Sequence, residues 1–339
     1  MNKYLLKKDG LNSLISGVAS SNGRFIAPGI EARQVVFKEV RSTEEIAKDY
    51  ILPRNSYKER LFPQTEAIAE FTILKNEATL SPVELSPPDT VIFGVRPCEA
   101  ASQRSLKAVF TWDYVDESYT KREDAAVVIT IACTKADNTC FCTTVGISPE
   151  TKDGSDIYLM ETESGDYVAE ALTEKGAAFA KKHGEAFEKN PTADVVVKRL
   201  FIPEKIKGID LEAIKKRLAD KTHYDSPLWP ELARKCIGCG ACTYSCPTCH
   251  CFDIIDEGGA YQGERRKNWD SCQFDIFTLH ASGHNPRDTQ YKRWRNRFMC
   301  KFHIYPTKFS STGCVGCGRC IRVCPVRLDI TEAMEAFSK

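Results

Sequence analysis

Two runs of four cysteines in the last third of this 339-residue chain constrain its fold more than any other feature. Each run has the pattern C-x2-C-x2-C-x3-C-P, which is typical of proteins that bind a pair of [4Fe–4S] clusters. The runs are Cys236, Cys239, Cys242 and Cys246 before Pro247, and Cys314, Cys317, Cys320 and Cys324 before Pro325. Two-residue gaps let a loop wrap around three corners of a cubane. The sequence therefore predicts two [4Fe–4S] clusters in this region.

The pattern also predicts that the runs exchange one ligand, because three cysteines of a run bind one cluster and the fourth binds the other. The first set of ligands is then Cys236, Cys239, Cys242 and Cys324. The second set is Cys314, Cys317, Cys320 and Cys246. A pair of zinc sites is the alternative, which the duplicated run with its terminal prolines disfavours.

Four more cysteines lie in the N-terminal half, beside two predicted strands. Thr90–Cys98 and Ala125–Ala132 are nearly continuous apolar runs, as expected of strands buried on both faces. Cys98 and Cys133 follow these strands, so parallel pairing would bring both thiols to one edge of a sheet. The third set consists of Cys98, Cys133, Cys140 and Cys142. Its spacing alone is compatible with a third [4Fe–4S] cluster, with a zinc site, or with inert buried thiols.

The last four cysteines lie between the two ferredoxin-type runs. The fourth set consists of Cys249, Cys251, Cys272 and Cys300. These residues could hold a fourth cluster or a metal, with His250 or His303 as substitute ligands. The alternative is that Cys249 and Cys251 line the cluster pair without binding iron.

The composition limits the kinds of partner. Sixteen cysteines in a chain of this length do not suit a small secreted disulfide scaffold, so metal or cluster ligands are favoured. A net charge of +1 gives no reason to expect nucleic acid as a partner. The apolar runs are too short to cross a bilayer, and the N-terminus does not resemble a signal peptide. We therefore expect a cytoplasmic protein without a membrane span.

The pattern of elements changes near residue 225. We expect an α/β domain over residues 1–225, with the third set, followed by a mainly helical dicluster ferredoxin domain over residues 226–339. The long segment 247–313 between the runs is expected to contain helices. Further helices are predicted in Leu11–Val18, Ala100–Phe110, Ala177–Asn190 and the end of Leu200–Asp220, and further strands in Arg24–Pro28, Asp156–Met160 and Tyr167–Ala169.

A basic stretch, Arg287–Lys301, precedes the second run. Cations that compensate the negative charge of clusters, or a solvated helix face, are the favoured interpretations, ahead of a docking patch for an acidic partner. The sequence contains no G-x-G-x-x-G after a strand, no Walker A loop and no nucleophile–base signature. We therefore predict no catalytic residues.

Several longer motifs together resemble a known family. They are Phe93–Cys98 (FGVRPC), Cys140–Thr143 (CFCT), Cys246–Asp253 (CPTCHCFD), Arg265–Cys272 (RRKNWDSC) and His284–Arg287 (HNPR). The chain is similar to the iron–sulfur electron-transfer component shared by anaerobic sulfite reductases and by cytosolic sulfhydrogenase-type [NiFe] hydrogenases, where it is the β subunit. The resemblance covers roughly residues 20–335.

The resemblance implies a role and partners. A flavin-bearing, diaphorase-like subunit would exchange electrons with NAD(P)H, a separate hydrogenase-like or sulfite reductase-like subunit would perform catalysis, and this chain would relay electrons between them. The resemblance also implies that the third set binds a cluster. One departure is Glu99, where the family usually has an aspartate after the first N-terminal cysteine. The acidic side chain is retained, so the departure does not affect the cluster assignment. It bears on which subfamily the chain resembles, and hence on the identity of the catalytic partner.

Two other functions remain as alternatives. The chain could be an enzyme subunit that performs redox chemistry on a cluster of its own, for example near Cys249 and Cys251. It could also be a docking module in which part of the cysteine sites hold zinc. Iron and sulfide content separates the relay from the zinc-binding module, because each [4Fe–4S] cluster contains about four irons.

Overall fold

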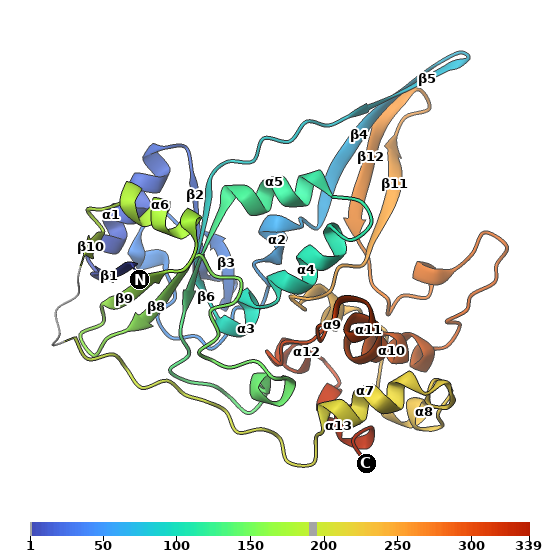
Figure 1. The fold of residues 1–339 in the computed structure, drawn as a ribbon. Coiled ribbons are helices and arrows are strands. Elements are labelled where there is room, and N and C mark those ends of the chain that lie inside the picture. Colours follow the sequence, from blue (N-terminus) through green and yellow to red (C-terminus); the bar gives the residue numbers. More distant parts are fainter. Residues whose placement is uncertain (1, 190–194) are drawn as a thin grey trace.

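A mixed β-sheet forms the centre of the N-terminal half in the computed structural model, which describes residues 2–189 and 195–339. Its described strands follow the spatial order β10-β1-β9-β8-β7-β6-β2-β3 (Figure 1). Their bounds are β1 Asn2–Leu6, β2 Arg24–Glu31, β3 Gln34–Glu39, β6 Thr90–Val95, β7 Ala126–Ile131, β8 Ile157–Glu161, β9 Tyr167–Ala171 and β10 Phe187–Lys189.

The middle of this sheet is parallel. Strand β6 pairs in parallel with both β2 and β7, and β7 pairs in parallel with β8. The predicted strands around Thr90–Cys98 and Ala125–Ala132 are thus confirmed as adjacent parallel strands. Ile92 and Ile129 are completely buried, which agrees with strands covered on both faces.

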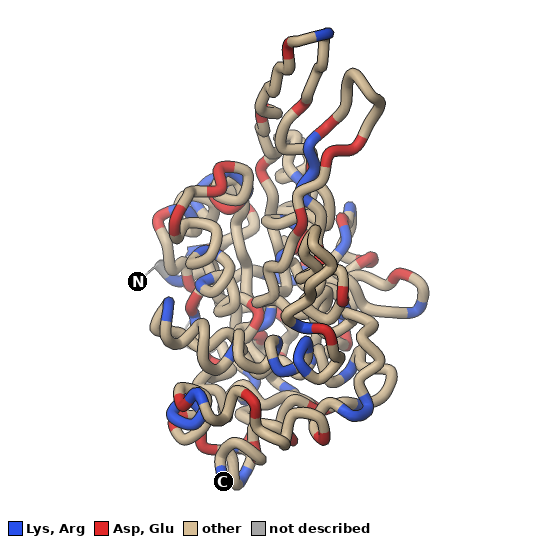
Figure 2. Tube along the Cα trace, turned by 90° about the vertical axis from the view of Figure 1, so that its right-hand side faces the viewer, with Lys and Arg blue, Asp and Glu red and all other residues tan. Residues whose placement is uncertain are grey.

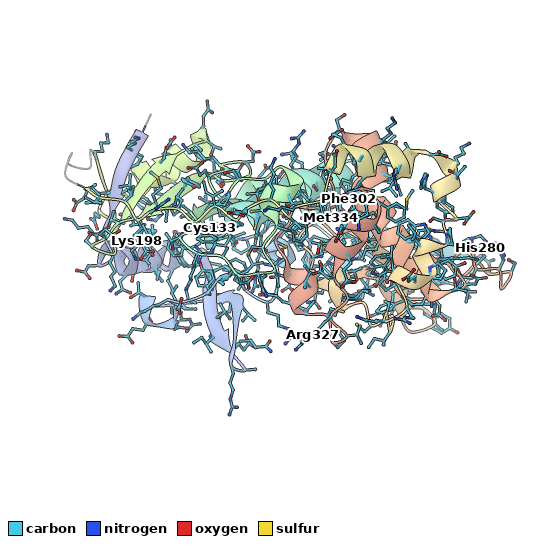
Figure 3. The ribbon with its side chains drawn as sticks, turned by 90° about the horizontal axis from the view of Figure 1, so that it is seen from below. Cys133, Lys198, His280, Phe302, Arg327 and Met334 are labelled. Atoms are coloured by element: carbon cyan, nitrogen blue, oxygen red, sulfur yellow. The ribbon has the colours of Figure 1, made fainter. Side chains whose placement is uncertain are left out.

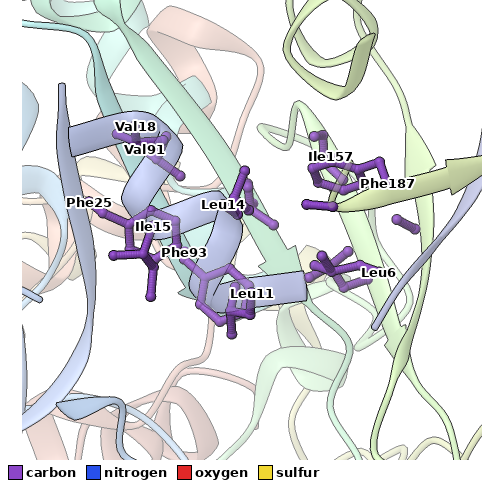
Figure 4. Close-up of a cluster of buried hydrophobic side chains, with 14 of the residues drawn as sticks. Leu6, Leu11, Leu14, Ile15, Val18, Phe25, Val91, Phe93, Ile157 and Phe187 are labelled. Atoms are coloured by element: carbon purple, nitrogen blue, oxygen red, sulfur yellow. The ribbon is translucent and has the colours of Figure 1, made fainter. Parts of the chain in front are cut away.

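Helices cover the sheet on both sides. On one face, α1 (Gly10–Ser20) buries Leu11, Leu14, Ile15 and Val18, which pack with Phe25, Val91 and Phe93 of the strands (Figure 4). The same core includes Ala180 of α6 (Glu174–Lys182). The other face carries α2 (Lys58–Leu61), α4 (Gln103–Phe110) and α5 (Glu117–Ala125), whose side chains form a second core with Ile92 and Val128. This is the α/β architecture that was predicted.

The prediction of a helix over Ala177–Asn190 is only partly correct. Helix α6 ends at Lys182, and Phe187–Lys189 forms the edge strand β10, whereas residue 190 lies outside the described residues. Strand β10 pairs with β1 from the start of the chain. Pairing between such distant segments is not visible in a local pattern.

A second sheet forms an arm that extends away from the main body (Figure 1). Its described strands are β4 (Thr65–Leu74), β5 (Glu77–Pro82), β11 (Phe252–Gly258) and β12 (Gln262–Trp269), in the antiparallel order β11-β12-β4-β5. Acidic and basic residues occur together along this arm (Figure 2). The hairpin β11–β12 occupies part of segment 247–313, where helices were expected. The arm therefore combines residues from both sides of residue 225.

Short helices hold the cysteine-rich part together. They are α7 (Leu211–Ala219), α8 (Leu228–Leu232), α9 (Ala241–Tyr244), α10 (Gln290–Met299), α11 (Tyr305–Phe309), α12 (Arg319–Arg322) and α13 (Ile330–Ala336). Their core contains Trp229, Phe298, Phe302 and Met334, the last two of which are labelled in Figure 3. Helices are thus present in this region, but the hairpin shows that it is not built from helices alone. No helix in the described residues is long and apolar enough to cross a membrane.

Candidate iron–sulfur sites

The first set of cysteines lines one cavity. Cys236, Cys239 and Cys242 reach it from the first run, and Cys324 reaches it from the second run. Gly238 has a φ of 70°, which keeps the loop tightly turned between the first two cysteines. The structure therefore brings together the residues that ligand exchange between the runs requires.

Hydrogen-bond donors surround the sulfur atoms of the first set. The side-chain amide of Gln290 donates to Cys236 Sγ over 3.3 Å, and the backbone N–H of Leu328 donates to Cys324 Sγ over 3.2 Å. Donors to sulfur stabilise the negative charge of cluster ligands and influence the reduction potential. Neither donor belongs to a cysteine run, so the run pattern does not reveal them.

The second set lies where the two runs meet. The Cys246 thiol acts electrostatically on both Cys314 and Cys317, and Cys320 acts on the same two thiols. The backbone N–H of Gly316 donates to Cys314 Sγ over 3.4 Å. The ammonium of Lys301 donates to Cys246 Sγ over 3.3 Å. A hydrogen bond with Cys249, followed by the charges of Lys301 and Arg297, lowers the pKa of Cys246.

The third set lies at the carboxyl edge of the parallel strands. Cys98 is in α3 (Pro97–Ala100), directly after β6, and Cys133 follows β7 on the α/β side of the molecule (Figure 3). Cys140 and Cys142 come from the loop after β7, and Cys142 begins a short 3-10 turn. All of these thiols line one pocket, together with Cys317 of the second set. The expected convergence at one sheet edge is therefore present.

Two glycines allow the second run to contact the loop of the third set. Phe141 donates its backbone N–H to the carbonyl of Gly316 over 2.8 Å. A Cβ atom on Gly316 would lie only 2.5 Å from the backbone of Cys142, and one on Gly318 would lie 2.1 Å from the carbonyl oxygen of Thr139. Both glycines also have positive φ angles. Glycine is therefore required here for a close approach between the two halves.

A buried ion pair, which no sequence motif indicated, also joins the two halves. Arg319 Nη2 and Glu99 Oε2 are 2.7 Å apart, and these side chains are 1% and 0% exposed. Arg319 also donates to the carbonyls of Pro53 and Ser245. The only local signal was position, because Glu99 follows Cys98 and Arg319 precedes Cys320. The pair therefore lies between the third set and the second run.

The fourth set is also brought together, and one of its two histidine neighbours, His250, is hydrogen-bonded elsewhere. The thiols of Cys251 and Cys272 are within hydrogen-bonding reach, and Cys249 and Cys300 lie within electrostatic reach of Cys251. His250 Nδ1 is 2.8 Å from the hydroxyl of Tyr305, and burial lowers the His250 pKa to about 4. His303 is half-buried, three positions after Cys300 in the chain. The structure gives neither histidine a clear role as a ligand.

The chemistry of the buried thiols fits bound clusters. Burial raises the pKa of Cys142 and Cys314 to about 11 and that of Cys242 and Cys317 to about 12. Desolvation disfavours the charged thiolate in each case. A buried thiolate therefore needs positive charge beside it, which iron supplies when it is bound. Converging thiols in water-poor cavities match the donor set of an iron–sulfur cluster.

Comparison with known proteins agrees with this chemistry. A family described as a 4Fe-4S dicluster domain matches residues 235–328, which contain both runs. Sulfhydrogenase 2 subunit beta of Pyrococcus furiosus is 32% identical over 320 residues, which cover 92% of this chain and 92% of the relative. The chain belongs to the sulfhydrogenase-type iron–sulfur subunit family. No solved structure was found to match it.

Membership of the sulfhydrogenase-type family confirms the resemblance that the sequence motifs predicted. The chain is an iron–sulfur protein of electron transport, and it binds [4Fe–4S] clusters. The relative comes from the sulfhydrogenase side of the two subfamilies that the motifs resembled. Glu99, the one departure noted in the sequence, is fully used as the buried partner of Arg319.

Proposed function

We propose that the chain relays single electrons through three [4Fe–4S] clusters, held by the first, second and third sets of cysteines. The relay would connect a flavoprotein subunit that exchanges electrons with NAD(P)H to a hydrogenase-like or sulfite reductase-like catalytic subunit. The relative's name, which makes it one subunit of a sulfhydrogenase, supports the expectation of such partners. We place this complex in the cytoplasm.

One observation carries the proposal, namely that the second set borders both of the others. Cys320 of the second set lines the cavity of the first set. Cys317 of the second set lines the pocket of the third set. These contacts support a continuous series in which the second set is the middle member. A series of neighbouring sites is what an electron relay requires, whereas an isolated structural metal site does not need it.

The chain's own residues would determine how the relay behaves. The clusters, when bound, supply one-electron redox chemistry. The thiolates hold them, while N–H groups such as those of Gly316 and Leu328 stabilise charge on sulfur. The apolar residues that line the cavity of the first set, Trp294 and Phe298 among them, exclude water from it. No protein side chain needs to act as an acid, a base or a nucleophile in this role.

The relay is tested on the complex rather than on the chain alone. The tagged chain is purified anaerobically from its host, and the co-purifying subunits are analysed for flavin. NAD(P)H is expected to bleach the cluster absorbance of the complex but not that of the isolated chain. Cys133→Ala is expected to lose about four irons and to stop electron transfer from the flavin to the catalytic subunit. Thr134→Ala, which changes the neighbouring residue without removing a thiol, is the control.

Three results would contradict the relay. The first is an isolated chain that contains zinc in place of iron and sulfide. The second is turnover by the isolated chain with an artificial reductant, which would indicate an enzyme. The third is a Cys133→Ala complex that has lost the iron of the third set but still passes electrons at the original rate.

A further inference from the structure

The fourth set of cysteines, Cys249, Cys251, Cys272 and Cys300, has no part in the three-site relay. Its members come from three separate places in the chain. Cys249 and Cys251 lie between α9 and β11, Cys272 follows β12, and Cys300 follows α10. Cys272 is buried and the other three are half-buried. All sixteen cysteines lie within the described residues, and all are free thiols.

The hairpin of the arm brings two of these thiols together. Strand β11 begins at Phe252 and β12 ends at Trp269, and these two residues are paired across the hairpin. The backbone N–H of Asp270 then donates to the carbonyl of Cys251 over 3.0 Å, which extends the contact below the paired strands. The thiols of Cys251 and Cys272 consequently face each other within hydrogen-bonding reach.

The last cysteine of the fourth set, Cys300, lies in a local irregularity of a helix. Residues Cys300–Ile304 form a π-helical turn between α10 and α11. Such turns are rare and are frequently found at functional sites. This turn begins at Cys300 and also carries Lys301. The Cys300 thiol lies within electrostatic reach of Cys272 and Cys246.

Three buried cations converge on Cys249. Arg297 Nη1 is 3.2 Å from Cys249 Sγ, Lys301 Nζ is 3.8 Å from the same sulfur, and Lys58 Nζ is 2.9 Å from the Cys249 carbonyl. Their relative exposures are 4%, 4% and 2%. In the described part of the chain none of the three has a carboxylate within ion-pair distance, and Arg297 Nη2 has no hydrogen-bond partner at all.

Buried cations without anions are costly, so the structure requires negative charge at this place. Arg297 and Lys301 also face the first and second sets, since Arg297 lines the first cavity and Lys301 contacts Cys246. Lys58 is different because its contacts are the Cys249 carbonyl and the ring of Trp269, 3.9 Å away. The thiol that acts most strongly on the Lys58 ammonium is that of Cys249, followed by Cys246 of the second set and by Cys251.

We propose that Cys249, Cys251, Cys272 and Cys300 bind a fourth [4Fe–4S] cluster. Four thiolates around an iron–sulfide core carry net negative charge, which compensates Lys58 and the unpartnered group of Arg297. In residues 2–189 and 195–339 no three His, Cys, Asp or Glu side chains converge closely enough to hold a single ion. Thiolates at the corners of a cubane are farther apart than the ligands of one ion, so this finding does not count against a cluster. This site does not depend on the relay through the other three.

The test counts iron and sulfide in the full chain, purified and reconstituted anaerobically. The wild type is expected to contain about sixteen irons with matching sulfide, and Cys272→Ala/Cys300→Ala about twelve. The twelve irons that remain show that the variant is folded. Met299→Leu, a volume-conserving change beside Cys300, is the packing control and is expected to keep the full iron count.

The outcomes separate this site from the relay. About twelve irons in the wild type, an unchanged count in the double variant, or an additional zinc would overturn the fourth cluster. The first two of these results would leave the three-site relay intact. Fewer than about twelve irons in the wild type would contradict the relay as well. If the double variant loses all its iron, the fourth cluster is judged from the wild type and from Cys251→Ala. About sixteen irons in the wild type and about twelve in Cys251→Ala support it, and equal counts overturn it.

Discussion

At the scale of single residues, the cysteine sites contain cations that are buried among the thiols. Lys301 donates to Cys246 Sγ and also to Thr248 Oγ1 and the carbonyl of Gly313, both over 3.0 Å. Two neutral oxygens and a thiol do not balance an ammonium charge in a buried place. For the basic stretch Arg287–Lys301, cations that compensate clusters were one of the favoured interpretations, and the burial of Arg297 and Lys301 agrees with it.

We expect Lys301→Met to lower the reduction potential of the cluster at the second set. Reduction adds negative charge, and a buried cation 3.3 Å from a ligand sulfur stabilises the reduced form. Removing the cation therefore makes the potential more negative. A redox titration of the purified protein, followed by EPR of the reduced clusters, measures the shift.

Lys308→Met is the matched control, because it removes the same charge from an exposed position. Water and salt screen that charge, so the potentials are expected to stay close to those of the wild type. An equal shift in both variants would mean that Lys301 acts only through the net charge of the chain.

At the scale of elements, each ferredoxin-type run is a loop followed by a short helix. Gly240 precedes α9 and Gly318 precedes α12, with φ angles of 73° and 72°. In each run the third cysteine lies in this helix and the fourth follows it. The fourth cysteine of the second run, Cys324, lines the cavity of the first run.

Pairs of substitutions can show which cysteines share a cluster. Cys236→Ala/Cys324→Ala changes two ligands of the first set, so one cluster is lost, about four irons, and the second cluster keeps its EPR signal. Cys314→Ala/Cys324→Ala takes one ligand from each set, so both dicluster signals are expected to change. Iron counting and EPR on the reduced proteins distinguish the two patterns. If the runs do not exchange ligands, the two patterns will be reversed.

At the scale of the whole molecule, the α/β half and the cysteine-rich half are joined through the second run. Arg319 contacts Glu99 and Pro53 on one side and Ser245 on the other. Arg322 pairs with Asp137 at 2.9 Å and donates to Cys140 Sγ over 3.3 Å. The second set therefore borders the third set across an interface that is fixed by ion pairs and by close contacts at glycine.

Glu99→Gln is expected to destabilise the whole molecule by about 3–5 kcal/mol, because it leaves the Arg319 charge buried without its carboxylate. Glu212→Gln, which breaks the exposed pair with Lys215 at 2.8 Å, is expected to cost less than about 1 kcal/mol. Unfolding by denaturant under anaerobic conditions, followed by tryptophan fluorescence, measures both. Equal effects would show that the buried pair does not hold the halves together.

Much of this organisation could be predicted from local patterns. The helix at Leu11–Val18 and the strands before Cys98 and Cys133 were confirmed, because an apolar period or a continuous apolar run reports the burial of a short segment. The arm was missed because β12 of its hairpin pairs with β4, nearly two hundred positions earlier in the chain, while β11 is largely exposed and β12 is mostly half-buried. Its strands therefore lack the alternation that a half-buried strand shows.

By itself, the sequence determined the type of cofactor and the family, because cluster ligands follow a short spacing that a single loop can satisfy. Only the tertiary structure decided what surrounds those ligands. It placed Cys317 beside the third set, buried Arg319 against Glu99, and gathered Lys58, Arg297 and Lys301 around Cys249. Each of these contacts joins residues that are far apart in the chain. Whether such residues come into contact depends on how the sheets and helices pack, and this cannot be inferred from a local sequence spacing.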